Sequence, residues 1–462
     1  MNLSGILTAG ANGLGAASHG TQVTAQNIAN ATTEGYTRRI AQFEAIPLDQ
    51  GGGVRSRGSN RVQDAYLERR GLSARAGDGE ASAKMETLSV FDAVFNEQQG
   101  SLGGALDAFD SAISDFAANP NSRANRQAIL SKAEDLSRAF NTSASALETA
   151  RIDSNGRISD AVRQVNSRLE EIADLGTHIV AAHINGSEAG DLEDKRDQLI
   201  REVGEYVPVQ VIPDKNGAIT LQLAGQRTLV GPDAKVHRLV AVPDSTSGDL
   251  RISRETSGAL EDITSMITSG RIGGTIAARD GALATAQAQL DQLASDVATA
   301  YNTQHALGYG ADGVNGRNLF AVPLPGITGS AAQFAVSSDV AGQPDLIGGA
   351  QDPLNLPSDN RNAIALLHVR DQNIALGGTG TAQQAFSAMV ADAGTASQSA
   401  THQASQASAV LAQIDNLRAS TSGVSSDEEM VQLMKFQRAY QASLRVIETA
   451  DSMLNDLLNL RR

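Results

Sequence analysis

Hydrophobic residues recur at intervals of four and three residues in two long ranges of the chain, 85–200 and 273–306. This spacing places apolar side chains on one face of a helix and predicts long amphipathic helices. Proline interrupts helix interiors, and the two ranges contain a single proline, Pro120, inside an Asn-Pro-Asn break. We therefore predict a bundle of helices, whose clearest apolar seam consists of Leu102, Leu106, Phe109, Ile113 and Phe116.

A shorter period, with apolar residues at every second position, separates the two helical ranges. Val207–Val211 and Ile219–Leu223 alternate on either side of an Asn-Gly turn at 216–217, which is a strong signal for a β-hairpin. Residues 206–256 therefore predict a small antiparallel β domain inserted into a helical protein. Its further strands are expected over 227–230, 236–242 and 250–253.

The last part of the chain carries the longest regular pattern. The acidic run Asp427–Glu429 precedes it and suits the N-terminal end of a helix. Residues 427–460 predict a helix about 50 Å long, given the rise per residue of an α-helix. Its apolar face is predicted to comprise Met430, Leu433, Phe436, Tyr440, Leu444, Ile447, Leu454 and Leu457.

The N-terminal segment has the same spacing, at Leu3, Leu7, Leu14 and Ile28, but it also contains several glycines. Each glycine costs a helix roughly 1 kcal/mol, so this segment is not expected to form a helix alone. We expect both ends to be helices that form when packed, on each other or on neighbouring subunits. A disordered N-terminal tail is the alternative, because residues 1–33 are polar and contain no Asp, Glu, Lys or Arg.

Composition narrows the possible functions. The net charge of −15 argues against nucleic acid as a partner. The absence of cysteine excludes disulfides, thiolate metal sites and cysteine nucleophiles. No stretch approaches the ~18 apolar residues of a membrane span, so membrane insertion is not expected. The N-terminus lacks the basic and apolar regions of a cleavable secretory signal.

The Gly- and Pro-rich range 308–357 predicts an irregular excursion before helix resumes near Asn360. Within it, Gly308–Gly313 matches G-x-G-x-x-G, but the motif follows a helix rather than a strand, so we predict a turn without a nucleotide. His178 and His183 are five residues apart, which does not place two metal ligands on one helix face. We therefore predict no catalytic residues, no metal, no cofactor and no enzyme activity.

Two terminal motifs resemble a known family. The segment 27–38, Asn-Ile-Ala-Asn-Ala-Thr-Thr-Glu-Gly-Tyr-Thr-Arg, resembles the N-terminal signature of the axial proteins of bacterial flagella, which include rod, hook and hook-associated proteins. Segments 427–430, 437–442 and 446–454 resemble the matching C-terminal signature. The resemblance implies an N-terminal assembly motif that includes Asn27, Ile28, Ala29, Asn30, Gly35 and Tyr36.

Interior segments are similar to those of the hook-associated members of this family, which lie at the hook–filament junction. They are residues 101–109, 194–199, 278–280, 301–309 and 318–320. Together with the periodicity, this resemblance implies a mainly α-helical fold in layers, with a small inserted antiparallel β domain. The terminal helices (1–40 plus 423–462) pair in a coiled-coil-like layer, the helical bundle (41–205 plus 257–422) lies next, and the β domain (206–256) is outermost. The chain is short for the family, which implies one outer domain rather than two.

The same resemblance implies a structural protein that assembles with copies of itself into a ring or helical tube. Hook protein and a second hook–filament junction protein are the expected neighbours. Export through the flagellar type III pathway is expected, with the charge-free N-terminus as an uncleaved signal and a cytoplasmic export chaperone bound beforehand. The predicted chaperone contacts are Phe436, Tyr440, Leu444 and Ile447. The expected location is extracellular, on the flagellum, after a transient stay in the cytoplasm.

Two other functions stay open. Another flagellar axial protein, of the hook or the distal rod, shares the terminal motifs but is expected to lack the interior segments. A rod-associated peptidoglycan hydrolase needs a catalytic module beyond the axial frame, and this chain ends on the terminal helix at Arg462.

Overall fold

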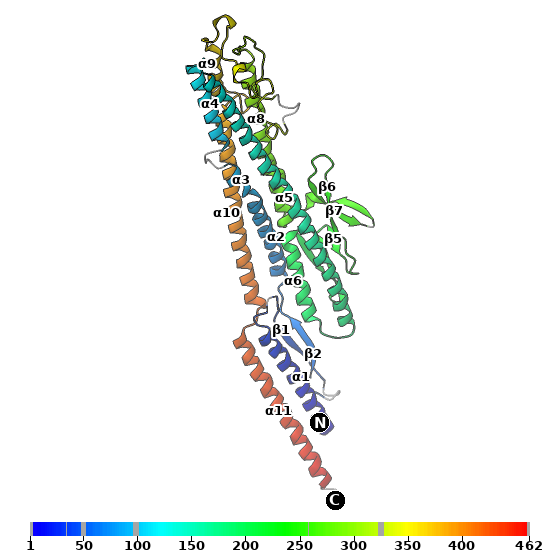
Figure 1. The fold of residues 1–462 in the computed structure, drawn as a ribbon. Coiled ribbons are helices and arrows are strands. Elements are labelled where there is room, and N and C mark those ends of the chain that lie inside the picture. Colours follow the sequence, from blue (N-terminus) through cyan, green and yellow to red (C-terminus); the bar gives the residue numbers. More distant parts are fainter. Residues whose placement is uncertain are drawn as a thin grey trace.

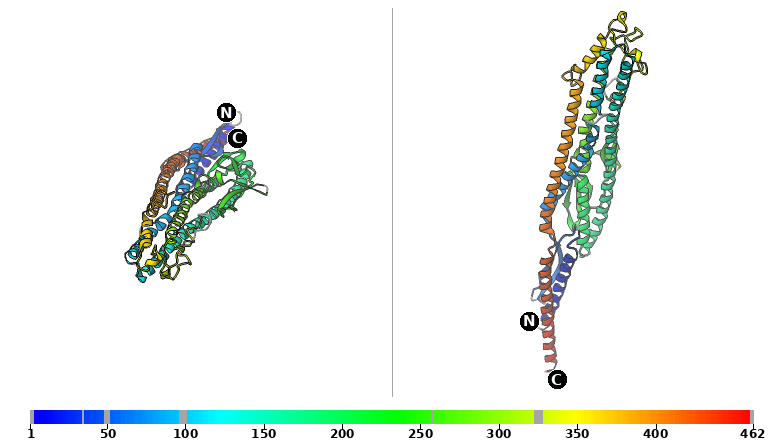
Figure 2. Two further views of the ribbon diagram at one scale, coloured as in Figure 1. Left: turned by 90° about the horizontal axis from the view of Figure 1, so that it is seen from above. Right: turned by 60° about the vertical axis from the view of Figure 1, so that its left-hand side comes forward.

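The computed structural model describes residues 3–33, 35–47, 52–95, 101–256, 258–321 and 328–459 of the chain. The molecule is an elongated rod (Figures 1 and 2), with the first and last helices side by side at one end. A shaft of long helices extends from this end to a tip of irregular loops. The helices are α1 (Leu3–Ala29), α2 (Ala65–Leu88), α3 (Val90–Val94), α4 (Leu102–Ala118), α5 (Arg123–Ile184), α6 (Gly190–Tyr206), α7 (Gly270–Ala278), α8 (Ala284–His305), α9 (Arg361–His368), α10 (Ala382–Ser422) and α11 (Ser426–Asn459).

The shaft has the helices that the periodicity predicts. α5 contains 62 residues, so it is roughly 90 Å long and runs from the tip to the opposite end of the shaft. The predicted seam of α4 is buried throughout, and the break around Pro120 separates α4 from α5. Aromatic rings fill the core near the tip, where the centroids of Phe140 and Phe334 lie 4.5 Å apart. These observations confirm the prediction of a mainly helical protein.

Two three-stranded antiparallel sheets lie on one flank of the shaft (Figure 1). The predicted hairpin is formed by β3 and β4, and its turn has positive φ angles of 54° at Asn216 and 75° at Gly217. The second sheet continues into β8, which the alternation does not predict because this edge strand has only one large apolar residue, Leu260. The strands are β3 (Val209–Pro213), β4 (Ile219–Leu223), β5 (Arg227–Val230), β6 (Leu239–Pro243), β7 (Leu250–Thr256) and β8 (Ala259–Asp262).

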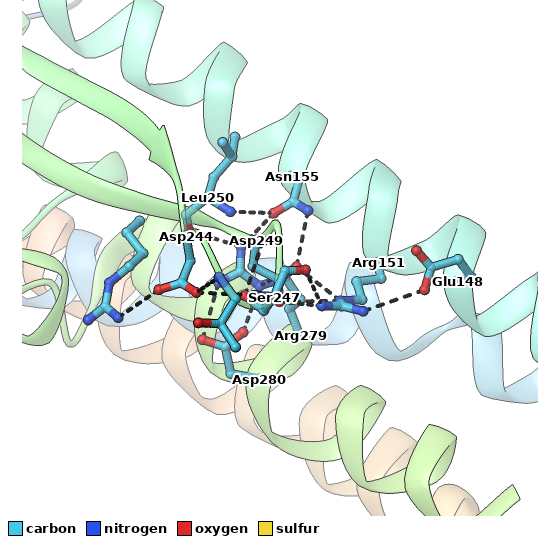
Figure 3. A network of polar contacts seen from close by, with 11 residues as sticks. Glu148, Arg151, Asn155, Asp244, Ser247, Asp249, Leu250, Arg279 and Asp280 are labelled. Carbon is cyan, nitrogen blue, oxygen red and sulfur yellow. Dashed lines mark hydrogen bonds and ion pairs between the residues drawn. The ribbon is translucent and has the colours of Figure 1, made fainter. Parts of the chain in front are cut away.

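A network of polar contacts fixes the second sheet to the shaft (Figure 3). The Arg151 guanidinium on α5 donates to the Asp249 carboxylate at 2.8–3.2 Å, and Asn155 Nδ2 donates to the same carboxylate at 3.2 Å. Buried Arg279 donates to Asn155 Oδ1 (2.6 Å) and to the Leu250 carbonyl (3.1 Å). Burial alone would raise the pKa of Asp249, but these donors lower it, so the carboxylate stays charged as an anchor for the sheet.

A second hairpin was not predicted: the sequence analysis assigned residues 41–61, which make up most of it, to the helical bundle. Strands β1 (Arg39–Ala45) and β2 (Val54–Arg61) pair antiparallel between the shaft and the terminal helices. The two strands are rich in arginine, and their apolar and polar residues do not alternate regularly. Much of the hairpin surface is exposed, so no continuous apolar face is needed. The domain boundaries proposed from the sequence stay predictions.

The excursion after α8 is held by a buried histidine, His305. Its Nδ1 lies 2.8 Å from the Arg317 carbonyl, and the Gly348 amide donates to its Nε2 at 3.0 Å. The ring must therefore be neutral, with its proton on Nδ1. Burial lowers the pKa of His305 below its usual 6.5.

This geometry predicts an acid-sensitive tip. In the unfolded chain His305 takes up a proton as the pH falls through 6.5, whereas in the folded chain burial opposes this protonation. The free energy of unfolding should therefore decrease below pH 6.5, by up to about 1.4 kcal/mol per pH unit. His305→Gln should abolish this dependence between pH 6.5 and 5 in urea unfolding. His402→Gln, at an exposed position on α10, is the control and should unfold like the parent protein.

Candidate assembly interface

The terminal helices α1 and α11 approach each other through the glycines of α1. A Cβ atom on Gly20 would lie 2.5 Å from the Phe436 ring, and one on Gly10 would lie 2.8 Å from Ile447 Cγ1. The residue opposite Gly13 is Ser443, 2.8 Å from such a Cβ. The glycines destabilise α1 as an isolated helix, but their lack of a side chain lets α11 pack closely against α1, and this packing stabilises it. The two ends therefore pack on each other within one chain, which is one of the two arrangements that the sequence analysis left open.

The β1–β2 hairpin covers a further side of α1. Asn12 Nδ2 donates to the Gly52 carbonyl at 3.3 Å, and Gly53 lies against the backbone of Ala9. The Phe43 ring contacts Phe436, with 5.8 Å between the centroids. The hairpin thus joins both terminal helices in one unit.

The predicted apolar face of α11 divides into a covered part and an exposed part. Phe436 and Ile447 contact α1, and Leu433 and Leu454 are half-buried. The other three described members are exposed: Met430 by 50%, Tyr440 by 37% and Leu444 by 37%. The side chain of Leu457 lies outside the described residues.

The predicted Met430 and Leu444 are exposed, and the residues directly before them, Glu429 and Ser443, are buried or in contact with α1. Ala450 is a further buried position outside the predicted apolar face. A count of apolar residues overlooks these positions because small or hydrogen-bonded side chains occupy them. On α1, Leu3, Leu7, Leu14 and Ile28 are half-buried and Ala29 is exposed; Asn30, directly after the helix, is half-buried.

Asn27 is the centre of the joint between the terminal helices and the shaft. Its side chain is 1% exposed, and all of its polar atoms are paired. Nδ2 donates to Glu429 Oε2 (2.9 Å) and to the Arg39 carbonyl (2.8 Å). Oδ1 accepts from the Tyr36 hydroxyl (2.9 Å) and from the Arg39 amide (3.0 Å). One amide thus connects α1, the turn after it, β1 and α11.

Two arginines extend the joint into the shaft. Arg38 Nε donates to Glu429 Oε1 at 2.7 Å, and its backbone amide donates to the Ser422 carbonyl at the end of α10 (3.0 Å). Buried Arg39 is paired with Asp191 and Asp194 of α6, and its guanidinium stacks 5.1 Å from the centre of the Tyr36 ring. The terminal unit is therefore fixed to α6 and α10 by charge-assisted hydrogen bonds, which are stronger than neutral ones.

The predicted motif residues have unequal roles in this joint. Asn27 and Tyr36 lie at its centre, and Gly35 has a φ of 83°, which favours glycine in the turn after α1. Sequence reasoning did not single out Arg39, Asp191 or Glu429 as members of one site. The available signals were Arg38 at the end of the N-terminal motif with Arg39 after it, the acidic run 427–429, and the interior segment 194–199, which begins with Asp194.

Tyr36 provides a spectroscopic probe of the joint. Its burial, with Asp194 and Asp191 nearby, raises the pKa of the hydroxyl to about 12, against the lowering influence of Arg39. Because the neutral form donates to Asn27, the joint should lose stability as the pH rises from 10 towards 12. Tyrosine ionisation is followed by ultraviolet absorbance as the pH is raised. The absorbance change of the parent protein minus that of Tyr36→Phe should show the late ionisation of Tyr36. Exposed Tyr66, replaced by phenylalanine, is the control and should leave the late ionisation of Tyr36 in place.

The glycine motif and the histidines weighed in the sequence analysis make contacts within the fold. Gly308–Gly313 forms the predicted turn, in which the Gly310 amide donates to the Val314 carbonyl (3.0 Å) and Asp312 pairs with Arg317. His183 lies 3.1 Å from Glu193. In the described part of the chain, no three His, Asp or Glu side chains gather as a metal site would require. Nor does any described helix combine the length and hydrophobicity needed to cross a membrane.

Comparison with known proteins relates this architecture to the flagellum. Residues 88–320 match the family described as the flagellar hook-associated protein FlgK helical domain. Residues 418–460 match the C-terminal family of the flagellar basal body rod FlgEFG proteins. The flagellar hook junction protein FlgK from Burkholderia pseudomallei has a similar fold, with a TM-score of 0.68 and 17% identity over 77% of this chain and 100% of that chain.

Two relatives are similar over almost the whole chain. Flagellar hook-associated protein 1 of Salmonella typhimurium is 27% identical over 558 positions, which cover 99% of this chain and 100% of that protein. The protein of the same name from Bacillus subtilis is 25% identical over 482 positions, or 94% of each. The alignment of 558 positions exceeds the 462 residues here, so the Salmonella protein contains internal segments without a counterpart in this chain.

Proposed function

This chain belongs to the FlgK family of flagellar hook-associated proteins and is a structural protein of the hook–filament junction, where we propose that its terminal helices drive self-assembly. The exposed apolar part of α11 carries this proposal. Met430, Tyr440 and Leu444 stay partly exposed after α1 has packed, although each would gain free energy from burial. Neighbouring copies that cover these side chains would form a ring or helical tube.

The joint suits a protein that transmits force between two polymers. The terminal unit extends from the end of the shaft (Figure 1), and the Asn27–Arg39 network holds it at a defined angle. Contacts in the inner layer can therefore position the shaft, and with it the outer sheets. Hook protein on one side and the second junction protein on the other are the proposed neighbours of this layer.

Export and chaperone binding form a further part of the proposal. Residues 1–33 contain no charged side chain of the Asp, Glu, Lys or Arg type, and α1 needs α11 for its stability, which suits passage through a channel as an unfolded chain. Phe436 and Ile447 are covered by α1 in the folded chain. A cytoplasmic chaperone that binds Phe436, Tyr440, Leu444 and Ile447 would therefore act before α1 packs on α11.

Electron microscopy tests the location, and a deletion tests the mechanism. An epitope on the exposed β6–β7 loop should label intact flagella only at the boundary between hook and filament. Deletion of residues 425–462 should abolish both chaperone binding and filament attachment. Label along the whole hook would favour another axial protein, and normal filaments with the deletion would contradict assembly through α11.

The absence of enzyme activity stays a prediction for this member of a structural family. A zymogram on peptidoglycan tests the hydrolase alternative directly. No clearing is expected at the position of the purified chain, whereas a clearing band would restore that alternative.

A further inference from the structure

A groove follows one side of α5 between Lys132 and Arg157. It comprises two adjoining hollows of roughly 920 and 720 Å³ that share Thr142 and Ala146. The opposite wall is formed by α3 and by the adjacent ends of α2 and α4. The groove extends along α5 for about 38 Å, which is long enough to hold a helix.

The middle of the groove is uncharged and lined by small side chains, and its charges lie at the two ends. Lys132 and Arg138, with Asp135 between them, line the end near the tip. Asp153, Arg157 and Glu86 of α2, which pairs with Arg157, line the other end. A helix with charged side chains along its face would lose their hydration in the middle of the groove without gaining a partner. The α5 side chains of this middle part are Ala139, Thr142, Ser145, Ala146, Thr149 and Ala150.

A surface with the complementary pattern lies on α10. Between Asp392 and Asp415 this helix contains no Asp, Glu, Lys or Arg, and its only titratable side chain is His402. The uncharged stretch is about 35 Å long, close to the length of the groove. Its exposed ridge, at spacings of three and four residues, consists of Thr395, Gln398, His402, Ser405, Ala409 and Ala412.

We propose that the groove on α5 holds the exposed ridge of α10 from a second copy of this chain. The proposal rests on the self-assembly proposed above and names the contact between neighbouring shafts. Both helices run from the tip towards the terminal unit (Figure 1). Subunits related by the symmetry of a ring or tube share one direction along its axis, so the two helices meet parallel. In this parallel arrangement Asp392 lies at the end of the groove where Lys132 and Arg138 outnumber the single anion Asp135.

The contact joins two different surfaces, so each copy still offers a free groove and a free ridge to further neighbours. Such a heterologous interface generates a ring or a helix rather than a closed dimer. Contact between shafts would then supplement the contact between terminal helices, and the two could be disrupted separately.

The absence of cysteine makes a cross-linking test clean. With Asp392 opposite Lys132, ridge residue Ala409 lies opposite groove residue Thr149, because each is 17 positions further along its helix. Single variants Thr149→Cys in the groove and Ala409→Cys on the ridge are co-expressed, and intact flagella are oxidised. Because the two thiols are adjacent only across the proposed contact, the mixture should give roughly tenfold more covalent dimer than either variant alone. One chain with both substitutions should give dimers, trimers and longer ladders.

A matched control uses Asp160→Cys, an exposed residue of α5 outside the groove, which should not cross-link to Ala409→Cys. Adding Ala146→Glu on the groove side should weaken the contact and reduce co-purification with a tagged second copy. Equal cross-linking of the control, or a dimer from Ala409→Cys alone, would overturn the proposed contact. Flagella that carry the protein without the cross-link would reject this contact alone, whereas absence of the protein from flagella would reject the proposed function.

Discussion

Replacement of Gly20 by leucine is expected to separate the two terminal helices and to leave cells without attached filaments. A Cβ atom at this position would lie 2.5 Å from the Phe436 ring, and Phe43 packs on the same ring. The ring therefore cannot move aside without losing the hairpin contact. An overpacking cost of about 3 kcal/mol would reduce the pairing equilibrium by roughly a hundredfold, and neither helix is expected to be stable alone.

Gly15 is a matched control for this prediction. It lies in the same helix, and a Cβ atom there would meet no heavy atom within 4 Å. Gly15→Leu should therefore keep filaments and should stabilise α1 slightly, because leucine favours a helix more than glycine does. Filament attachment by electron microscopy and hydrogen exchange of the α1 amides measure the effect. Equal filament counts in the two variants would show that close helix contact is not needed for assembly.

The sequence predicted those helices and strands in which apolar residues recur at a regular spacing. The seam from Leu102 to Phe116 lies in the core, because apolar side chains at helical spacing favour burial. The helix over 427–460 also appears, although part of its apolar face stays exposed. The Asn-Gly hairpin was predicted for a similar reason, since its turn needs residues that accept positive φ.

The contacts between the two ends could not be predicted in the same way. Their closest approach uses Gly20 and Ser443, which a hydrophobic pattern does not register as contact residues. The joint connects Asn27 with Glu429 across 402 positions of sequence, so no local rule relates them. Resemblance to the axial signature selected Asn27 and Tyr36, but their partners became evident only when α1, β1, α6 and α11 were placed together.

Replacement of Asn27 by aspartate is expected to open the joint while preserving the size of the side chain. Nδ2 of Asn27 donates to Glu429 Oε2 at 2.9 Å, so the substitution would place two carboxylates in contact at a buried position. The loss of two donated hydrogen bonds and the repulsion should cost about 3 kcal/mol or more, and filament attachment should fail. Asn30→Asp is the control, because Asn30 Nδ2 donates to a single carbonyl, that of Gln26.

Two responses would show that charge in the joint, rather than general damage, causes this loss. Acidification should partly restore the variant, because a proton shared by the two carboxylates replaces the missing donor. Glu429→Gln added to Asn27→Asp should also restore filaments in part, because it returns an amide and a carboxylate to the contact with their positions exchanged. Protection of the α1 amides from hydrogen exchange should rise in the same order as filament attachment. A double variant no better than Asn27→Asp would mean that the Asn27–Glu429 pair does not hold α1 to α11 at the joint.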